Sequence, residues 1–115
     1  MSVSGLGGEF ALIGMAESAV GIVPDKSPRE LCVQVTLDAI KDAGLTLAEV
    51  DGLITCNAFA EPIMYHAEAV AEYIGWQPQH CVTVNTGGGT TFMALNTAAA
   101  AIQAGMANTI VVAMA

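Results

Sequence analysis

Apolar residues along this chain are concentrated in short runs that alternate with longer amphipathic stretches. Each run is rich in Val, Ile, Leu and small residues and is nearly continuous, which is typical of strands covered on both faces of a sheet. We therefore predict four strands, at residues 9–16, 52–56, 80–85 and 108–115.

The stretch after the first run carries the start and stop signals of a helix. Ser27 is a suitable N-cap, Pro28 takes the first helical position, and Glu30 completes the spacing of a capping box. Gly44 predicts the end of the helix. The stripe expected to face the core consists of Leu31, Val35, Leu37 or Asp38, and Ile40.

Two further helices are predicted, at 62–75 and 89–106. The first has Ile63, His66, Ala67, Val70 and Ile74 near one stripe and ends at Gly75. The second has no charged residue between Gly89 and Met106. A helix that is apolar or small all round is normally buried, so we expect it to be covered by protein on every side.

The predicted order of elements is β-α-β-α-β-α-β. Such alternation specifies right-handed crossovers and a mainly parallel sheet with helices on its faces, so the fold class is α/β. Residues 9–115 form one structural unit in this prediction, and residues 1–8 form a flexible N-terminus.

The composition limits the kinds of partner that the chain can have. Its net charge is −8 with three Lys and Arg residues, which argues against binding to nucleic acid or to an anionic membrane. Only 12% of its residues are charged, against about 25% in typical domains. Together with the 54% of hydrophobic residues, this predicts a part of a larger core or a subunit with an extensive partner surface.

The three cysteines are widely spaced and show no metal-binding pattern. No secretory signal is recognised, so we expect a reduced, cytoplasmic setting. The apolar stretch 94–115 is interrupted by polar residues and is not predicted to span a membrane.

The segment "NTGGGTT" is the main candidate for a functional loop, because it joins a strand to the N-terminus of a helix. In parallel sheets ligands bind at this edge, and free backbone N–H groups there favour an anion or a developing oxyanion. The loop matches neither a P-loop nor a dinucleotide fingerprint. Two interpretations stay open: a ligand-facing loop, and a tight turn that starts a buried helix close to its strand.

Other reactive side chains are more simply explained by packing. Cys32 and Cys81 are expected in the core, and Cys56 is the best-placed thiol because it ends the second predicted strand. His66 is expected to be packed or to face a partner, and His80 to be exposed. No Ser/His/Asp or Cys/His set can be assembled. Polar loop residues that could line a site are Glu17, Asn57 and Glu61.

Three segments carry a resemblance to a known family. They are "ALIGMAES", "SPRELCVQVTLDAIKDAGLTLAEVDGLI" and "VTVNTGGGTTFMALNTAAAAIQAGMANTIVVAMA", which together cover nearly the whole chain after residue 8. They resemble the N-terminal part of thiolase-superfamily proteins, in the branch of sterol-carrier-protein-type thiolases and thiolase-like lipid-transfer proteins.

The resemblance implies a layered sandwich of two similar halves, with the third helix of the N-terminal half in the central layer. It also implies that a C-terminal half or a second subunit supplies further catalytic groups, so that the chain is either a fragment or a short subunit and is inactive alone. A homodimer and a small OB-fold partner protein are further expectations. The substrate would be a coenzyme A thioester, with no covalently bound cofactor and no metal.

One position departs from the thiolase pattern. The resemblance aligns the nucleophilic cysteine of thiolases with Gly88, and a glycine cannot form an acyl-enzyme. This favours retro-aldol cleavage or formation of a carbon–carbon bond over acyltransferase chemistry, in lipid metabolism such as the degradation of steroids or aromatic compounds. The alternative is an inert scaffold that binds acyl-CoA or a partner. The expected substrate-binding residues are Asn85, Thr86, Gly87, Gly88, Gly89, Thr90 and Cys56.

Overall fold

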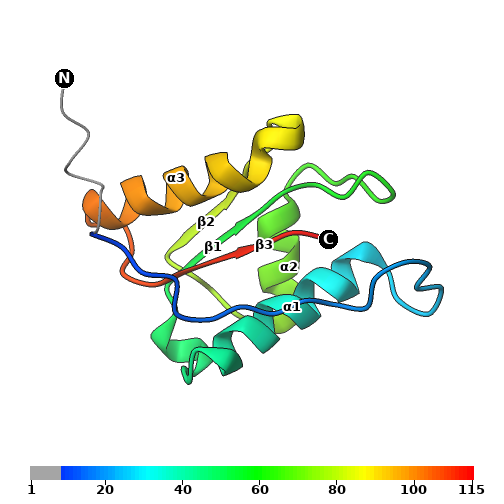
Figure 1. The fold of residues 1–115 in the computed structure, drawn as a ribbon, viewed down its shortest axis with the longest axis horizontal. Coiled ribbons are helices and arrows are strands. Elements are labelled where there is room, and N and C mark those ends of the chain that lie inside the picture. The colour runs from blue at the N-terminus through cyan, green and yellow to red at the C-terminus, as the bar shows by residue number, and fades with distance from the viewer. Residues whose placement is uncertain (1–8) are drawn as a thin grey trace.

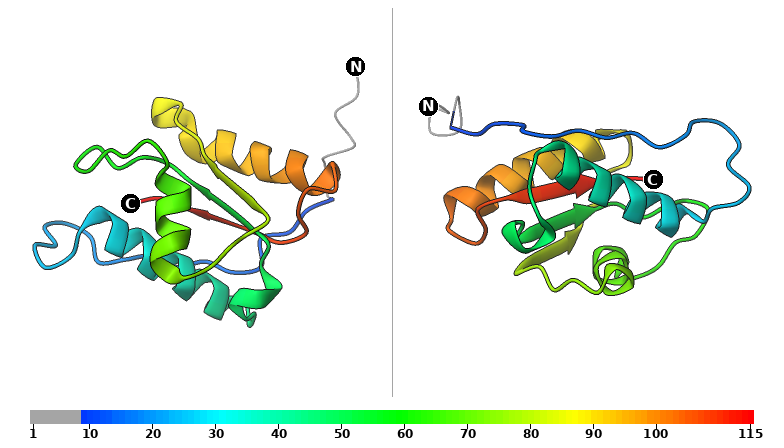
Figure 2. Two further views of the ribbon diagram at one scale, coloured as in Figure 1. Left: turned by 180° about the vertical axis from the view of Figure 1, so that it is seen from behind. Right: turned by 90° about the horizontal axis from the view of Figure 1, so that it is seen from below.

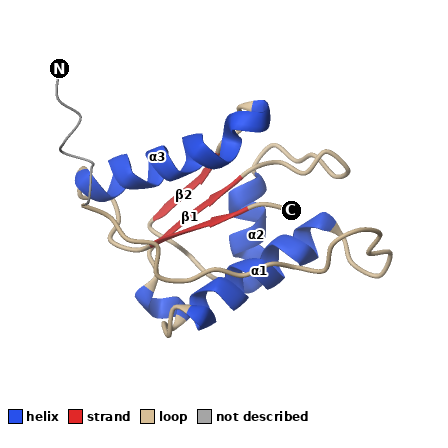
Figure 3. Ribbon diagram, in the orientation of Figure 1, coloured by secondary structure: helices blue, strands red, loops and turns tan. Residues whose placement is uncertain are grey.

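The computed structural model describes residues 9–115 and shows a small parallel sheet with helices on both faces (Figure 1, Figure 3). The prediction for residues 1–8 lies outside the described residues. In chain order the elements are α1 (Pro28–Asp42), the 3-10 turn η1 (Leu47–Glu49), β1 (Gly52–Thr55), α2 (His66–Ile74), β2 (His80–Thr83), the 3-10 turn η2 (Gly87–Gly89), α3 (Thr90–Gln103) and β3 (Ile110–Ala113).

Strand β1 is the centre of the sheet. The order is β2-β1-β3 and both pairings are parallel, with Thr55 of β1 opposite Thr83 of β2. All four residues of β1 are buried, whereas β2 and β3 are mostly half-buried because each has one unpaired edge. The near-continuous apolar run therefore predicted the central strand correctly.

The helices form two layers around the sheet. Helices α1 and α2 cover one face and α3 covers the other (Figure 2). Adjacent residues of β1 point to opposite faces: Leu53 belongs to the core under α1 and α2, and Ile54 packs against Ala94 and Ala98 of α3.

The prediction of a strand at 9–16 was wrong. This segment is extended but has no strand partner among residues 9–115, and it runs over α1, where Gly14 lies so close that a Cβ would be 2.6 Å from the Ala39 carbonyl oxygen. The Met15 N–H donates to Asp42 Oδ2 at 2.9 Å. A groove of about 570 Å³ is lined by residues 10–17 and by β3. The segment is strand-like in composition, but it does not pair with the free edge of β3, although both line the same groove.

Helix α1 begins and ends where its sequence signals place it. Ser27 Oγ accepts from the Glu30 N–H at 3.1 Å, and Gly44 takes a left-handed φ of +73° just after the last turn. The predicted inward stripe is only partly correct, since Leu37 is 40% exposed. Because α1 packs against both β3 and α2, its buried face is Cys32, Val33, Thr36 and Ile40.

Helix α2 begins at His66, four residues later than predicted. The preceding loop is held outside the helix by Asn57, whose Oδ1 accepts from the Ile63 N–H at 3.3 Å. The end of the helix at Gly75, with φ of +80°, agrees with the prediction.

Helix α3 is only half-buried in this chain, so the expectation of cover on every side is not met by the described residues. Its inner face consists of small residues, whereas Phe92 on the outer face is 74% exposed. None of the helices formed by residues 9–115 is long and apolar enough to cross a membrane.

Candidate functional site at the carboxyl ends of the strands

The loops that follow β1 and β2 meet at the carboxyl edge of the sheet. The Val84 N–H donates to the Thr55 carbonyl oxygen at 2.8 Å, so the β1–β2 contact continues one residue beyond the strands. The Asn57 N–H then donates to Asn85 Oδ1 at 2.9 Å. These bonds place two of the predicted site residues, Cys56 and Asn85, on neighbouring segments, although they lie far apart in the sequence.

The glycine loop is a tight turn that is fastened by one threonine. Thr90 Oγ1 donates to the Gly87 carbonyl oxygen at 2.7 Å and accepts from the Thr86 N–H at 2.9 Å. Gly87 takes a left-handed φ of +65°, which a residue with a Cβ rarely adopts. The tight-turn interpretation is therefore correct as a description of the backbone.

The same loop is also open to solvent. Residues 85–89 are exposed, and the Thr90 N–H is already bonded to the Gly87 carbonyl oxygen. Within the described part of the chain no hydrogen bond is recorded for the N–H groups of Gly87 and Gly88, whereas the Gly89 N–H belongs to the 3-10 turn. The first two amides can donate to an anionic oxygen that approaches the start of α3.

Gly88 differs from Gly87 in that nothing in the backbone requires a glycine there. Its φ is not positive, and a Cβ built on it would meet no atom within 4 Å. A cysteine side chain would therefore fit at the position where the resemblance places a nucleophile. Its absence is not explained by packing.

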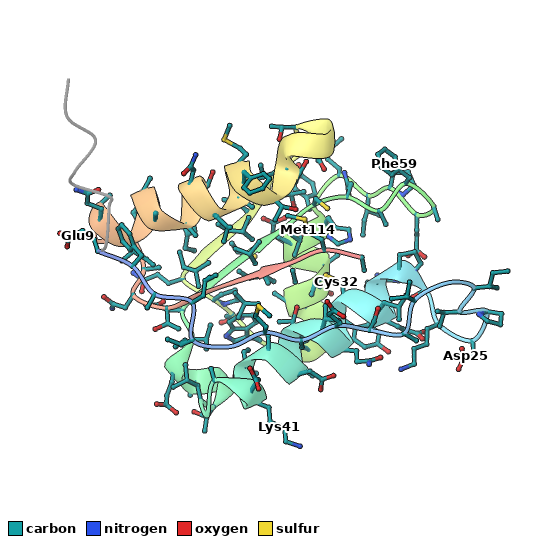
Figure 4. All side chains as sticks on the ribbon, in the orientation of Figure 1. Glu9, Asp25, Cys32, Lys41, Phe59 and Met114 are labelled. Carbon is teal, nitrogen blue, oxygen red and sulfur yellow. The ribbon has the colours of Figure 1, made fainter. Side chains whose placement is uncertain are left out.

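The cysteines that are present are poor nucleophiles. Burial raises the pKa of Cys32 and of Cys81 to about 11, and it also raises the pKa of Cys56. All three thiols are therefore protonated near neutral pH. Figure 4 shows Cys32 in the interior, and the prediction that it is a core residue is confirmed.

The histidines occupy opposite ends of the sheet. His66 is 1% exposed, which confirms that it is packed, and its Nδ1 lies 2.7 Å from Thr55 Oγ1. Burial lowers the pKa of His66; the Arg29 charge lowers it further, and Glu61 opposes that change. The prediction that His80 is exposed was wrong, because it is half-buried and its Nε2 is buried without a hydrogen-bond partner among the described residues.

Two polar residues of this edge, Thr55 and Thr83, were not indicated by the sequence pattern. Their side chains bind the start of α2, through His66 and through the Ala67 N–H, which donates to Thr83 Oγ1 at 3.0 Å. Threonine is common in strands, so the sequence held no signal that would have separated them from ordinary strand residues.

The polar loop residues Glu17 and Glu61 do not join Asn57 in its bond to Asn85. Glu61 is paired instead with Arg29, with 3.8 Å between Oε1 and Nη2. Within residues 9–115 no three His, Cys, Asp or Glu side chains are grouped closely enough to hold a metal ion.

Comparison with solved structures identifies the architecture. A segment of 3-oxoacyl-[acyl-carrier-protein] synthase III from Aquifex aeolicus VF5 matches with a TM-score of 0.71 and 19% sequence identity, over 82% of this chain and 31% of that chain. The fold is thiolase-like. No protein-family model matches the chain.

Two further matches concern relatives of higher sequence identity. The structure of an Ltp2-ChsH2(DUF35) aldolase matches with a TM-score of 0.62 and 32% identity, over 77% of this chain and 22% of that chain. The 17-hydroxy-3-oxo-4-pregnene-20-carboxyl-CoA lyase of Mycobacterium tuberculosis (strain ATCC 25618 / H37Rv) is 29% identical over 108 residues. The match covers 92% of this chain, which spans about a quarter (27%) of the length of that lyase.

Proposed function

We propose that this chain supplies the glycine-loop edge of a thiolase-like enzyme that cleaves or forms a carbon–carbon bond in an acyl-CoA. The reaction is retro-aldol cleavage, or its reverse, rather than cysteine-dependent acyl transfer. A lyase that acts on an acyl-CoA and an aldolase are among the relatives, at 29% and 32% identity, which supports this class of reaction. The sterol-carrier-protein-type subfamily and a steroid or aromatic acyl group belong to the same proposal.

The observation that carries the proposal is the bare, open position at Gly88. A thiolase-type reaction needs a thiolate at this point, and the chain offers a glycine with empty space around it. The three cysteines that it does contain have a raised pKa and are not activated. A reaction that needs no covalent acyl-enzyme is consistent with such a site.

Retro-aldol cleavage makes a different demand on the site. A base removes the proton of the β-hydroxyl group, the carbon–carbon bond breaks, and its electron pair forms the enolate of the shortened thioester. The former β-carbon leaves as a carbonyl compound, and the enolate then takes up a proton to give the shorter acyl-CoA. In the proposal, the N–H groups of Gly87 and Gly88 stabilise the enolate oxygen, while Gly89, Cys56, Asn85, Thr86 and Thr90 complete the wall of the site.

The base and the rest of the site come from the remaining part of the enzyme. Thus the complete protein includes a C-terminal half or second subunit, forms a homodimer and works with a small OB-fold partner. The present chain spans 22–31% of the related chains, which supports the first of these features, the additional half or subunit. The chain without those parts binds the thioester but does not turn it over.

The placement of the thioester beside the glycine loop is tested with a cysteine substituted for Gly88. Gly88→Cys and the control Ala104→Cys, at the exposed far end of α3, are treated with chloroacetyl-CoA and with iodoacetamide. Binding of the coenzyme beside the loop raises the local concentration of the first reagent. We therefore expect chloroacetyl-CoA to alkylate Gly88→Cys about 100-fold faster than Ala104→Cys. Iodoacetamide should label both at similar rates, and equal rates with both reagents would refute the placement.

The reaction itself is tested on the assembly that purifies with the tagged chain. A β-hydroxyacyl-CoA is supplied, and the shorter acyl-CoA and the carbonyl product are measured together by mass spectrometry. We expect both products in equal amounts without added free coenzyme A. Binding of the substrate without either product would favour the inert scaffold, and a requirement for free coenzyme A would favour thiolysis.

A further inference from the structure

The start of α2 is bonded to the ends of two neighbouring strands. His66 and Ala67 are consecutive residues, and they bind Thr55 and Thr83, which lie opposite each other in the β1–β2 register. The two distances, 2.7 Å and 3.0 Å, are those of good hydrogen bonds. Thus one helix terminus fixes the relative position of two strand ends.

The glycine loop follows directly from these strand ends. Thr55 is two residues before Asn57, and Thr83 is two residues before Asn85, so the Asn57–Asn85 bond closes the same small ring of contacts. Asn85 is followed at once by Thr86, whose N–H is held by Thr90 Oγ1. These hydrogen bonds and the short chain segments between them connect both strand ends to the backbone of Gly87–Gly89.

The pair formed by His66 and Thr55 is fully buried, with exposed fractions of 1% and 0%. Burying two polar side chains lowers stability unless they are bonded to each other, whereas apolar residues of the same size would pack without this requirement. Burial and the nearby Arg29 favour the neutral imidazole, which can share one proton with the threonine hydroxyl. Such a hydrogen bond fixes the orientation of the two side chains as well as their contact.

We propose that His66 is a positioning residue, which acts through Thr55 and the Asn57–Asn85 bond to hold the amides of Gly87–Gly89 in place. The importance of this position for catalysis rests on the proposed function, but the coupling from His66 to the loop does not. It can therefore be measured without any substrate.

The test compares two substitutions at one position. His66→Leu removes the bond and leaves an apolar side chain, and His66→Asn keeps a polar atom near the place of Nδ1. Amide NMR spectra of the 15N-labelled chain should show shifts at Asn57, Asn85 and Gly87–Gly89 in His66→Leu and near-native positions in His66→Asn. Shifts that stay within α2 in both variants would overturn the inference, even if stability falls.

A second measurement links the same pair to the site. In the Gly88→Cys background, His66→Leu should slow alkylation by chloroacetyl-CoA by about five- to tenfold, with the rate for iodoacetamide unchanged and with rescue by His66→Asn. Thr55→Val, which keeps the volume of the side chain, should have the same effect if His66→Leu does not fold. If Gly88→Cys shows no preference for the coenzyme A reagent at all, the proposed function fails, and the NMR comparison still decides the positioning role.

Discussion

The two faces of the sheet differ in the extent of their hydrophobic cores. Under α1 and α2 the core contains large side chains, among them Leu53, Val70 and Trp76. Under α3 the buried cluster consists of Ile54, Ala94 and Ala98. The face with α1 and α2 is a complete hydrophobic core, whereas the face with α3 has only a thin one.

The outer surface of α3 explains this difference. Phe92 and Met93 are exposed on it, and no charged residue occurs between Gly89 and Met106. A helix that faces water normally has a polar side, so α3 has the composition of a buried helix but only one covered side. The thin core is consistent with a helix whose second side is packed against further protein.

The largest expected effect comes from adjacent residues of β1 that point to the two faces. Leu53→Ala should lower the free energy of unfolding by about 3–5 kcal/mol, and Ile54→Ala by about 2–3 kcal/mol. Both side chains are 0% exposed, but a cavity under α3 has partly exposed neighbours, such as Val82 and Val112, that can move to close it. Urea unfolding monitored by circular dichroism measures both values. An equal or larger loss in Ile54→Ala would show that the α3 face is packed as rigidly as the other.

A smaller effect is expected on association. The chain should self-associate through the outer side of α3, and Phe92→Glu should weaken the association by about tenfold because a buried aromatic contact is replaced by a charge. Tyr73→Glu is the matched control, since Tyr73 is 59% exposed on α2. Sedimentation velocity over a range of concentrations separates the two variants. A monodisperse monomer of the unaltered chain would contradict the uncovered-helix argument.

The smallest effect concerns pH, and it is confined to the face with α1 and α2. Burial lowers the pKa of His66 below its ordinary value of 6.5, so the unfolded chain binds more protons than the folded one as the medium becomes acidic. The stabilisation is fully present above pH 6.5 and is lost as the pH falls toward the lower pKa of the folded state. His66→Asn keeps the hydrogen bond but has no group that titrates in this range. It should therefore reduce the dependence of stability on pH. Thermal unfolding between pH 5 and pH 7, about one and a half units below to half a unit above the ordinary pKa of histidine, measures this dependence. An unchanged slope would show that other groups cause it.

Several features of the fold could be predicted from the sequence because they depend on local chemistry. The caps at Ser27, Gly44 and Gly75 lie where the residue types indicate, since each one satisfies backbone groups or allows a left-handed φ within a few residues. The apolar run at β1 was also sufficient to predict the central strand. The strand expected at 9–16 did not form because pairing depends on how the segment is placed against a free edge such as that of β3, which no local pattern determines.

The site was predictable only in part. The position of the glycine loop and Asn85 at the carboxyl edge was predictable because a strand, a turn and a helix follow one another in sequence. The bond between Asn57 and Asn85 and the pair of His66 with Thr55 join residues 28 and 11 positions apart. Such contacts depend on strand order and register, so Thr55 and Thr83 looked like ordinary strand residues.

The sequence by itself determined the alternation of helices and strands, the helix caps and the absence of a side chain at Gly88, because periodicity and residue type are local properties. The tertiary structure decided which strand ends meet, which histidine is buried and which side of α3 is left uncovered. Those outcomes depend on packing between segments that are distant in the sequence, because their residues come into contact only after the sheet has formed.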